Sequence, residues 1–246
     1  MKRLGIIGGT TLGNLQQAGK TRTENIVTPF GDPSSAYTII EFNGVELVFL
    51  SRHGTQHSIP PHLINYRANV WGMQQLKAEA VIAFATVGGI TQTMLPGSLV
   101  VPDQLIDYTH GRSDTFYDRE FSIERHIDFT NPYDEKLRQK LLIAARQAGL
   151  QVMSRATYGV TQGPRLETAA EIRRMAQDGC DLVGMTGMPE AALARELNLP
   201  YACCAVVVNS AAGLAAEITI DEIRAIAHDS HTKLWQWLEA FALMYK

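Results

Sequence analysis

Short apolar segments that end in glycine or polar residues constrain the fold of this chain more than any other feature. Val81–Thr86 and Tyr201–Val208 are two such segments, and their continuous apolar character is typical of strands buried on both faces of a sheet. Amphipathic helical segments lie between the apolar ones, and the last of them begins at a capping box of Thr219 and Glu222. This alternation predicts an α/β fold, a three-layer α/β/α domain with a mixed central β-sheet.

Turn and cap residues predict where the other elements begin and end. Asn43-Gly44 lies between two β-rich segments and predicts a hairpin. Asn131 is the expected N-cap of a helix with Pro132 at its first position, and Gly149 is expected to end that helix. The further expected strands are Leu4–Ile7, Tyr37–Phe42, Val45–Leu50, Leu99–Val101, Ala156–Thr161 and Leu182–Met185, and the further expected helices are Pro61–Lys77, Thr168–Gln177 and Pro189–Glu196.

Composition limits the partners of the chain. No linker, repeat or charge block divides residues 1–246, so we expect a single domain. The 22 Lys and Arg residues are balanced by 25 Asp and Glu residues, which argues against nucleic acid or an anionic membrane as a partner but leaves a local anion site open. The three cysteines form no disulfide framework or metal motif. We therefore expect a cytoplasmic protein.

The loop Gly8–Gly13 follows the first expected strand. A dinucleotide-binding loop requires Gly-x-Gly-x-x-Gly, but Thr10 occupies the position of the second glycine. This departure leaves little support for a dinucleotide-dependent enzyme. The loop instead offers backbone N–H groups and the Thr10 hydroxyl, which suit an oxyanion. An ordinary tight turn after a strand is the alternative.

Ser51–His57 brings a cation and two imidazoles to the end of the expected hairpin. Arg52 offers a planar set of donors for a phosphate, and His53 adds a donor whose charge could follow pH. A zinc site of His53 and His57 is an alternative, but that spacing needs a helix, which Gly54 disfavours. A purely structural Arg–His pair that faces solvent is the other alternative.

Three more candidate residues lie at the ends of expected elements. Glu167 lies where a helix begins, so it could bind a ligand or simply be a carboxylate that the helix dipole stabilises. Thr186 lies between a strand and a helix and could bind an anion or cap that helix. Asn209 follows a buried strand, where α/β folds place ligands, but asparagine is also a common turn residue. The residues alone leave these alternatives open.

Several blocks of the sequence, in the same order, match a known family. They are Gly5–Leu12, Thr28–Gly31, Arg52–Gly54 with His57, Asn65–Asn69, Gly163–Arg165, and Met185–Thr186 with Pro189–Glu190. Through them the chain resembles, over nearly its whole length, the trimeric purine nucleoside phosphorylase and methylthioadenosine phosphorylase family. The resemblance implies the nucleoside phosphorylase fold and a pentosyltransferase that cleaves a purine nucleoside with inorganic phosphate as co-substrate. It also implies a homotrimer, no metal and no organic cofactor.

The resemblance assigns residues to the phosphate and to the sugar. The phosphate-binding residues that it implies are Thr10, Arg52, His53 and Thr186, with the backbone of Thr86. This assignment agrees with the anion-binding chemistry of the same side chains. It places Met185 against the ribose and adds Leu166 and Ala211 to the substrate site. The family usually has glycine where this chain has Thr11, so the first loop departs from the family pattern.

Asn209 and Glu167 are the base-binding residues that the resemblance implies, and together with His53 they are the predicted catalytic residues. An ionised Glu167 only accepts hydrogen bonds, so it suits the N1–H of a 6-oxopurine and not the bare N1 of adenine. Asn209 can donate to O6, and its carbonyl can accept a hydrogen bond from the proton that N7 gains as the glycosidic bond breaks. The methylthioadenosine branch has Asp and Ser at these two positions, so the Asn/Glu pair predicts hypoxanthine or guanine as the base.

The last helix discriminates between substrates at the 5′ end. Family members that cleave inosine have a histidine at the start of this helix, whereas this chain has Ile220, with Ile223 one turn later. Both side chains suit a methylthio group, although they could simply belong to the apolar stripe of the helix. His126 matches a family residue that reaches the 5′ pocket of the neighbouring subunit, which is one reason to expect a trimer.

The two pockets together predict S-methyl-5′-thioinosine as the substrate. Within the family, the alternatives are a general 6-oxopurine nucleoside phosphorylase that acts on inosine and guanosine and, after it, a methylthioadenosine phosphorylase. A nucleoside-binding protein without catalysis is the alternative from another class. Phosphate-dependent release of a purine base separates the enzymes from the binding protein.

Overall fold

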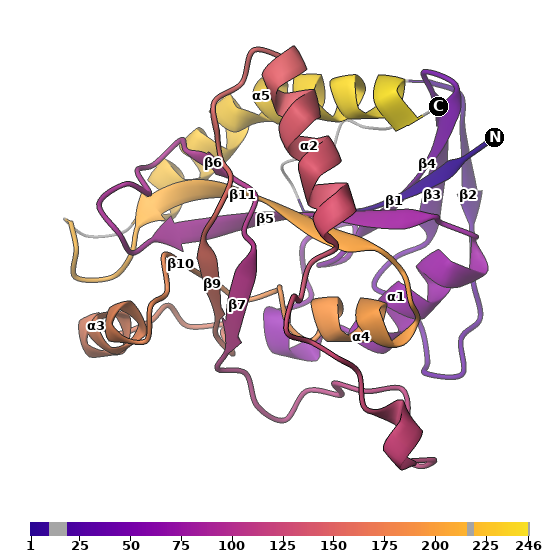
Figure 1. Cartoon of the computed structure of the whole chain (residues 1–246), viewed down its shortest axis with the longest axis horizontal. Coiled ribbons are helices and arrows are strands. Elements are labelled where there is room, and N and C mark those ends of the chain that lie inside the picture. The colour runs from indigo at the N-terminus through magenta and orange to yellow at the C-terminus, as the bar shows by residue number, and fades with distance from the viewer. Residues whose placement is uncertain (10–18, 216–218, 246) are drawn as a thin grey trace.

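A computed structural model describes residues 1–9, 19–215 and 219–245 of the chain. Within these residues, eleven strands form one mixed sheet with helices on both of its faces (Figure 1). The strands are β1 (Arg3–Gly8), β2 (Thr21–Glu24), β3 (Tyr37–Phe42), β4 (Val45–Ser51), β5 (Ala80–Gly89), β6 (Leu99–Val100), β7 (Gln104–Asp107), β8 (Val152–Met153), β9 (Thr157–Val160), β10 (Leu182–Gly184) and β11 (Tyr201–Ser210). The helices are α1 (Tyr66–Gln75), α2 (Glu135–Gln147), α3 (Ala169–Gln177), α4 (Glu190–Glu196) and α5 (Ile220–Tyr245), with the short 3-10 helices η3 (Pro61–Leu63) and η4 (Ile123–Arg125).

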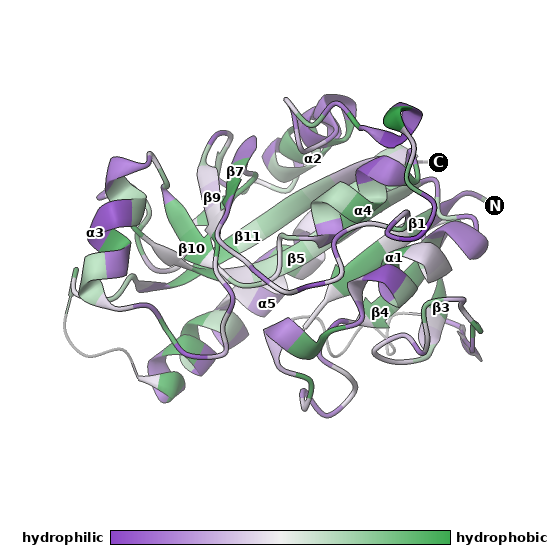
Figure 2. Ribbon diagram, turned by 90° about the horizontal axis from the view of Figure 1, so that it is seen from below, coloured by the Kyte–Doolittle hydropathy of each residue, from purple (hydrophilic) through white to green (hydrophobic). Residues whose placement is uncertain are grey.

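The sheet separates two large apolar cores. α2 and α5 contact each other and β11 on one face, and α1 and α4 contact each other on the opposite face (Figure 1). The first core includes Leu141 and Trp237, and the second includes Met73 and Leu193. The central strands between the cores are strongly hydrophobic (Figure 2). This arrangement confirms the predicted three-layer α/β/α fold with a mixed sheet.

Local turn and cap signals predict several boundaries correctly. Asn43 and Gly44 both have positive φ angles, 47° and 85°, as a two-residue hairpin turn requires, and they join antiparallel β3 and β4. Gly149, with a φ of 70°, follows the end of α2. Thr219 accepts a hydrogen bond from Glu222 N at 3.3 Å at the start of α5. No helix in the described part of the chain is long and apolar enough to cross a membrane.

The prediction that Asn131 caps a helix is wrong. Asp134 is the N-cap of α2, because its side chain accepts from Leu137 N at 2.7 Å and its own N–H donates to Tyr201 O at 2.8 Å. Asn131 and Pro132 therefore lie in the segment before the helix. Both Asn and Asp are good caps, and the contact with β11 holds Asp134 rather than Asn131 at the helix start.

The helix expected over Pro61–Lys77 is divided. Pro61–Leu63 forms a 3-10 turn, and α1 begins only after Asn65, whose side chain accepts from Ala68 N at 3.1 Å. Asn65 Nδ2 also donates to Phe30 O at 2.8 Å, which joins the start of α1 to the loop between β2 and β3. Pro61 therefore lies in a short 3-10 helix and not in a continuous α-helix.

β5 borders a gap in the sheet. β11 pairs with one edge of β5 along nearly its whole length, so β1 and β10 share the other edge. β1 pairs with Ala80–Ala83 and β10 pairs with Gly88–Gly89. Phe84–Val87 therefore has no strand neighbour on this edge within the described residues. The gap lies where β1 ends, the place at which open α/β sheets bind ligands.

The backbone direction of β5 shows which groups face this gap. Successive residues of a strand direct their N–H and C=O groups to opposite edges. Val81 N–H donates to Pro200 O on the β11 side at 2.8 Å, so the alternation turns the backbone of Phe84 and Thr86 toward the gap. Phe84 O accepts a hydrogen bond there from Arg52 Nη1 at 3.0 Å.

Candidate active site

A cavity of about 390 Å³ opens at the carboxyl ends of β1, β4, β5 and β11. A cavity of this size suits a small molecule. The predicted site residues that line it are Arg52, His53, Thr86, Leu166, Glu167, Met185, Thr186, Asn209, Ala211 and Ile223. Segments far apart in the sequence thus come together around one space.

The other predicted site residues lie elsewhere. Thr10 and the unusual Thr11 belong to a segment outside the described residues. Ile220 is the first residue of α5, is 56% exposed and does not line the cavity. His126 follows η4 on an exposed segment, where its ring lies edge-on to Phe121 at a centroid distance of 5.2 Å. The prediction that His126 serves a neighbouring subunit stays a prediction.

Arg52 is held by a buried ion pair. The guanidinium, 2% exposed, donates from Nε to Glu190 Oε2 and from Nη2 to Glu190 Oε1, both at 2.8 Å. Tyr201 donates its hydroxyl proton to Glu190 Oε1 at 2.8 Å. Burial alone lowers the pKa of Arg52, but the charge and hydrogen bonds of Glu190 outweigh this effect and raise it. The cation is therefore fixed in charge and in orientation, and it does not face solvent as a loop arginine would.

The same contacts leave part of the guanidinium available. Arg has five N–H donors, and Glu190 and Phe84 O occupy three of them. One N–H on each Nη remains, and Arg52 lines the cavity. The sequence did not predict these roles of Glu190 and Tyr201, because no local pattern shows which carboxylate will pair with a buried arginine.

His53 is neutral and points one nitrogen at a backbone carbonyl. Its Nδ1 lies 2.9 Å from Ile59 O, and because a carbonyl only accepts, Nδ1 carries the proton and Nε2 is left as an acceptor. Burial, followed by the nearby Arg52 cation, lowers the pKa of His53 to about 4. The expectation that the charge of His53 follows pH near neutrality is therefore wrong.

The zinc alternative at His53 and His57 has no support in the geometry. Residues 52–57 form turns instead of the helix that the spacing needs. The two rings lie against each other, with centroids 4.4 Å apart. No group of three or more His, Cys, Asp or Glu in the described residues could hold a metal ion.

Thr86 and Thr186 line the same cavity as Arg52. The backbone of Thr86 faces the gap beside β5. Thr186 is 8% exposed, and its N–H lies 3.5 Å from the Tyr158 hydroxyl. α4 begins after Pro189, which provides no side-chain cap. Thr186 therefore does not have the capping role that was the alternative for it.

Glu167 lies just before α3 and has no part in capping it. Thr168 is the N-cap, and Glu171 completes the capping box with it. Thr161 Oγ1 donates to Glu167 Oε1 at 2.6 Å, which orients the carboxylate beside the cavity. Thr168 and Glu171 thus make the capping hydrogen bonds, and Glu167, which makes none of them, lines the cavity.

Asn209 lies within β11, at an irregularity in its pairing with β5. The register shifts between Val207 and Asn209, and this bulge re-aims the side chain. Asn209 Nδ2 donates to Ser210 O at 2.7 Å, which leaves Oδ1 as an acceptor. Gly88 lies opposite, and a Cβ there would come within 3.3 Å of Asn209 Nδ2. Asn209 is therefore a strand residue on the cavity wall and not a turn residue.

Comparison with known proteins identifies the family. The family model described as "Phosphorylase superfamily" matches residues 3–242. The chain belongs to the phosphorylase superfamily.

Relatives within this superfamily are close in sequence and in structure. The chain is 51% identical over 222 residues, 89% of each chain, to a Xanthomonas campestris protein named "Probable S-methyl-5'-thioinosine phosphorylase". It is 46% identical to a Pyrococcus furiosus "6-oxopurine nucleoside phosphorylase", over 88% of this chain and 83% of that one. The methylthioadenosine phosphorylase from Schistosoma mansoni in complex with adenine has a TM-score of 0.94 at 29% identity, covering 100% of this chain and 92% of that one.

The Arg52–Glu190 pair predicts a large stability difference between two glutamate variants. Glu190→Gln leaves a buried cation without its carboxylate, so we expect it to lower the free energy of unfolding by about 3–5 kcal/mol. Glu171→Gln changes the exposed pair with Arg165 (2.7 Å) and keeps a capping-box residue, so we expect a loss below about 1 kcal/mol. Urea unfolding of the two variants tests this, and equal losses would contradict it.

The lowered pKa of His53 predicts a pH dependence of stability. The unfolded chain binds a proton at His53 near pH 6.5, whereas the folded chain does so only near pH 4. Since the unfolded state binds more protons between these values, the free energy of unfolding falls as pH is lowered from about 6.5 to 4. His53→Asn keeps a donor for Ile59 O but does not titrate. Urea unfolding across this range should show that the free energy of unfolding depends less steeply on pH in His53→Asn than in the wild-type chain. An unchanged dependence would show that the pKa of His53 is not lowered in the folded chain.

Proposed function

We propose that this phosphorylase cleaves S-methyl-5′-thioinosine with inorganic phosphate and releases hypoxanthine and 5-methylthioribose 1-phosphate. The relatives named above support a 6-oxopurine nucleoside as the substrate class. The single observation that carries the proposal is that Asn209 and Glu167 line the same cavity as Arg52 and Thr186. A base-binding pair and an anion-binding set are thus available to one bound nucleoside and one phosphate.

Phosphate binds, in this proposal, at the gap beside β5. The two remaining N–H groups of Arg52, the Thr86 N–H and the Thr186 hydroxyl are its donors, with the neutral His53 as an acceptor for a phosphate hydroxyl. One phosphate oxygen attacks the anomeric carbon as the bond to the purine N9 breaks, and the electron pair of that bond passes to the purine. Because the donors are fixed before the substrate arrives, they require little reorganisation at the transition state.

The purine lies between Asn209 and Glu167. Glu167, oriented by Thr161, accepts a hydrogen bond from N1–H. Asn209 Oδ1 accepts a hydrogen bond from N7–H, and the second Nδ2–H donates to O6. Adenine reverses the donor and acceptor at positions 6 and 1. Each buried mismatch costs about 1–3 kcal/mol, so the pair is selective for 6-oxopurines.

The 5′ substituent meets an apolar wall in this proposal. Ile223 lines the cavity, and so do Ile59, Pro60 and Pro61, whose side chains cannot bond a hydroxyl. His57 and Ser58, which precede Ile59, are polar lining residues. A methylthio group suits the apolar neighbours better than a hydroxyl does. Ile220 does not line the cavity, so this part of the proposal rests on Ile223.

A second copy of the chain completes the site in the proposed homotrimer. The His126 ring lies edge-on to Phe121, and its Nδ1 lies 3.0 Å from Ile123 O. The side chains of Phe121 and Ile123 are 68% and 72% exposed. Apolar side chains of this size are commonly covered in an assembly. We further propose a cytoplasmic location, since the three cysteines are free and buried, as in a reducing compartment.

A general 6-oxopurine nucleoside phosphorylase is the second candidate. The relative from Pyrococcus furiosus carries this name, which favours inosine or guanosine as the substrate. The two candidates share the base pocket and differ only at the 5′ end. The similarity to the Schistosoma mansoni enzyme makes methylthioadenosine the third substrate to compare.

Phosphorolysis of three nucleosides tests the proposed function. Initial rates on S-methyl-5′-thioinosine, inosine and methylthioadenosine are measured with and without phosphate. We expect phosphate-dependent release of hypoxanthine, with the highest kcat/KM for S-methyl-5′-thioinosine. A higher value for inosine would favour the second candidate, and base release from none of the three would reject a phosphorylase acting on them.

Variants of the base pocket test the residue assignment. Asn209→Asp places a second acceptor against O6, so we expect kcat/KM for S-methyl-5′-thioinosine to fall by about 10–100-fold. The ratio of kcat/KM for methylthioadenosine to kcat/KM for S-methyl-5′-thioinosine should rise. The double variant with Glu167→Ser should shift this preference further. If both variants keep the wild-type base preference, the assignment of Asn209 and Glu167 to the base is wrong.

A further inference from the structure

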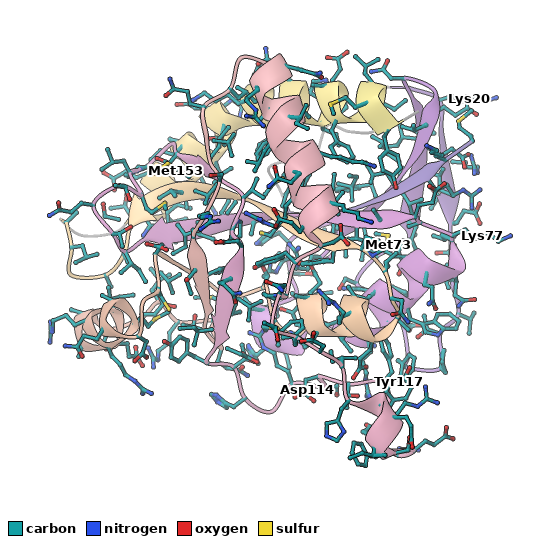
Figure 3. All side chains as sticks on the ribbon, in the orientation of Figure 1. Lys20, Met73, Lys77, Asp114, Tyr117 and Met153 are labelled. Carbon is teal, nitrogen blue, oxygen red and sulfur yellow. The ribbon has the colours of Figure 1, made fainter. Side chains whose placement is uncertain are left out.

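Arg112 lies between β7 and η4, on a segment that Asp114 and Tyr117 mark at the lower side of Figure 3. Its guanidinium donates to backbone carbonyls and to neutral side chains. The carbonyl acceptors are Thr161 O at 3.1 Å, Gln162 O at 2.9 Å, Met185 O at 2.9 Å and Met188 O, and the side-chain acceptors are Gln162 Oε1 at 3.2 Å and the Tyr66 hydroxyl at 3.1 Å.

All of these acceptors except the Tyr66 hydroxyl, which belongs to α1, lie on two loops that leave neighbouring strands. β9 and β10 are parallel, and their last ladder pair is Val160 with Gly184. Thr161 N–H donates to Gly184 O at 2.8 Å as the final backbone bond between them. Beyond this point Arg112 bridges the carbonyls of both loops. It therefore joins the two loops where the strand pairing ends.

Each of the two loops carries residues of the proposed nucleoside site. The first contains Thr161, whose hydroxyl holds Glu167, and the second contains Met185 and Thr186. The loops also touch directly, because a Cβ added at Gly163 would lie 2.6 Å from Met185 Sδ. A shift of one loop against the other would therefore move Glu167 relative to the sugar and phosphate residues.

The arrangement depends on the geometry of arginine. A guanidinium has five donors spread over a plane, whereas a lysine ammonium places three donors at one point. Tyr66 lies against the guanidinium, with Arg112 Cζ 5.3 Å from the ring centroid, and helps to fix its plane. In the described part of the chain no carboxylate forms an ion pair with Arg112, so its donors serve the two loops and the Tyr66 hydroxyl.

We propose that Arg112 is a positioning residue for purine selectivity. It does not line the cavity, so it acts through the loops that hold Glu167 and Met185. The inference rests on the proposed function for the identity of the base that Glu167 recognises. Loss of Arg112 would let the Glu167 loop move, and an error of about 1 Å in such a site is enough to cost a large part of its discrimination.

Binding of free bases tests this role. Dissociation constants for hypoxanthine and adenine are measured by calorimetry on the wild-type chain, Arg112→Met, Arg112→Lys and the control Arg3→Met. The control also removes an arginine bond to a backbone carbonyl, Leu76 O at 2.8 Å, but near the start of β1. We expect the adenine-to-hypoxanthine ratio of dissociation constants to fall by about tenfold in Arg112→Met, to fall in Arg112→Lys as well, and to stay at the wild-type value in Arg3→Met.

The outcome is read against melting temperature, which separates positioning from stability. An unchanged ratio in the Arg112 variants, with a lower melting temperature alone, would show a merely structural role and overturn the proposal. If Arg112→Met does not fold, Arg112→Lys decides the question by the same ratio, and a wild-type chain that does not prefer hypoxanthine also overturns it. Wild-type phosphorolysis is measured separately, so a chain that prefers hypoxanthine but cleaves no nucleoside would reject the proposed function and leave the role of Arg112 standing.

Discussion

The buried pair of Arg52 and Glu190 is the interaction on which the rest of the candidate site depends. It joins the residue after β4 to the first residue of α4, and Phe84 O and the Tyr201 hydroxyl tie β5 and β11 to the same pair. Breaking such a pair leaves an uncompensated charge in the interior, which costs far more than losing a surface ion pair. The cavity wall is therefore built around a fixed guanidinium.

This construction changes the electrostatic picture of a phosphate site. Arg52 and a protonated His53 would make a cationic site, but Glu190 balances the charge of Arg52 and His53 is neutral. The described residues thus offer oriented donors instead of net positive charge. Preorganised N–H and O–H groups can stabilise an anion without excess charge, because they are already aimed when it arrives.

Local signals predicted the parts of the fold that local chemistry decides. The Asn43-Gly44 turn needs positive φ at two positions, and few residue pairs allow this. The predicted start of α2 was wrong because Asn131 and Asp134 are both good caps, and a hydrogen bond to β11 favours Asp134. The residues on the cavity wall were mostly foreseen from strand ends and from the family resemblance. The partners that orient them, Glu190 for Arg52 and Ile59 O for His53, could not be, since tertiary contacts alone bring them together.

A crystal structure of the enzyme with phosphate and hypoxanthine tests the central claim most directly. We expect phosphate in the gap beside β5, within hydrogen-bond distance of an Arg52 Nη and of Thr86 N, with Arg52 still paired to Glu190. We also expect hypoxanthine N1 at Glu167 and N7 at Asn209. Phosphate bound away from β5, or Arg52 released from Glu190 to reach it, would show that the proposed phosphate site is wrong.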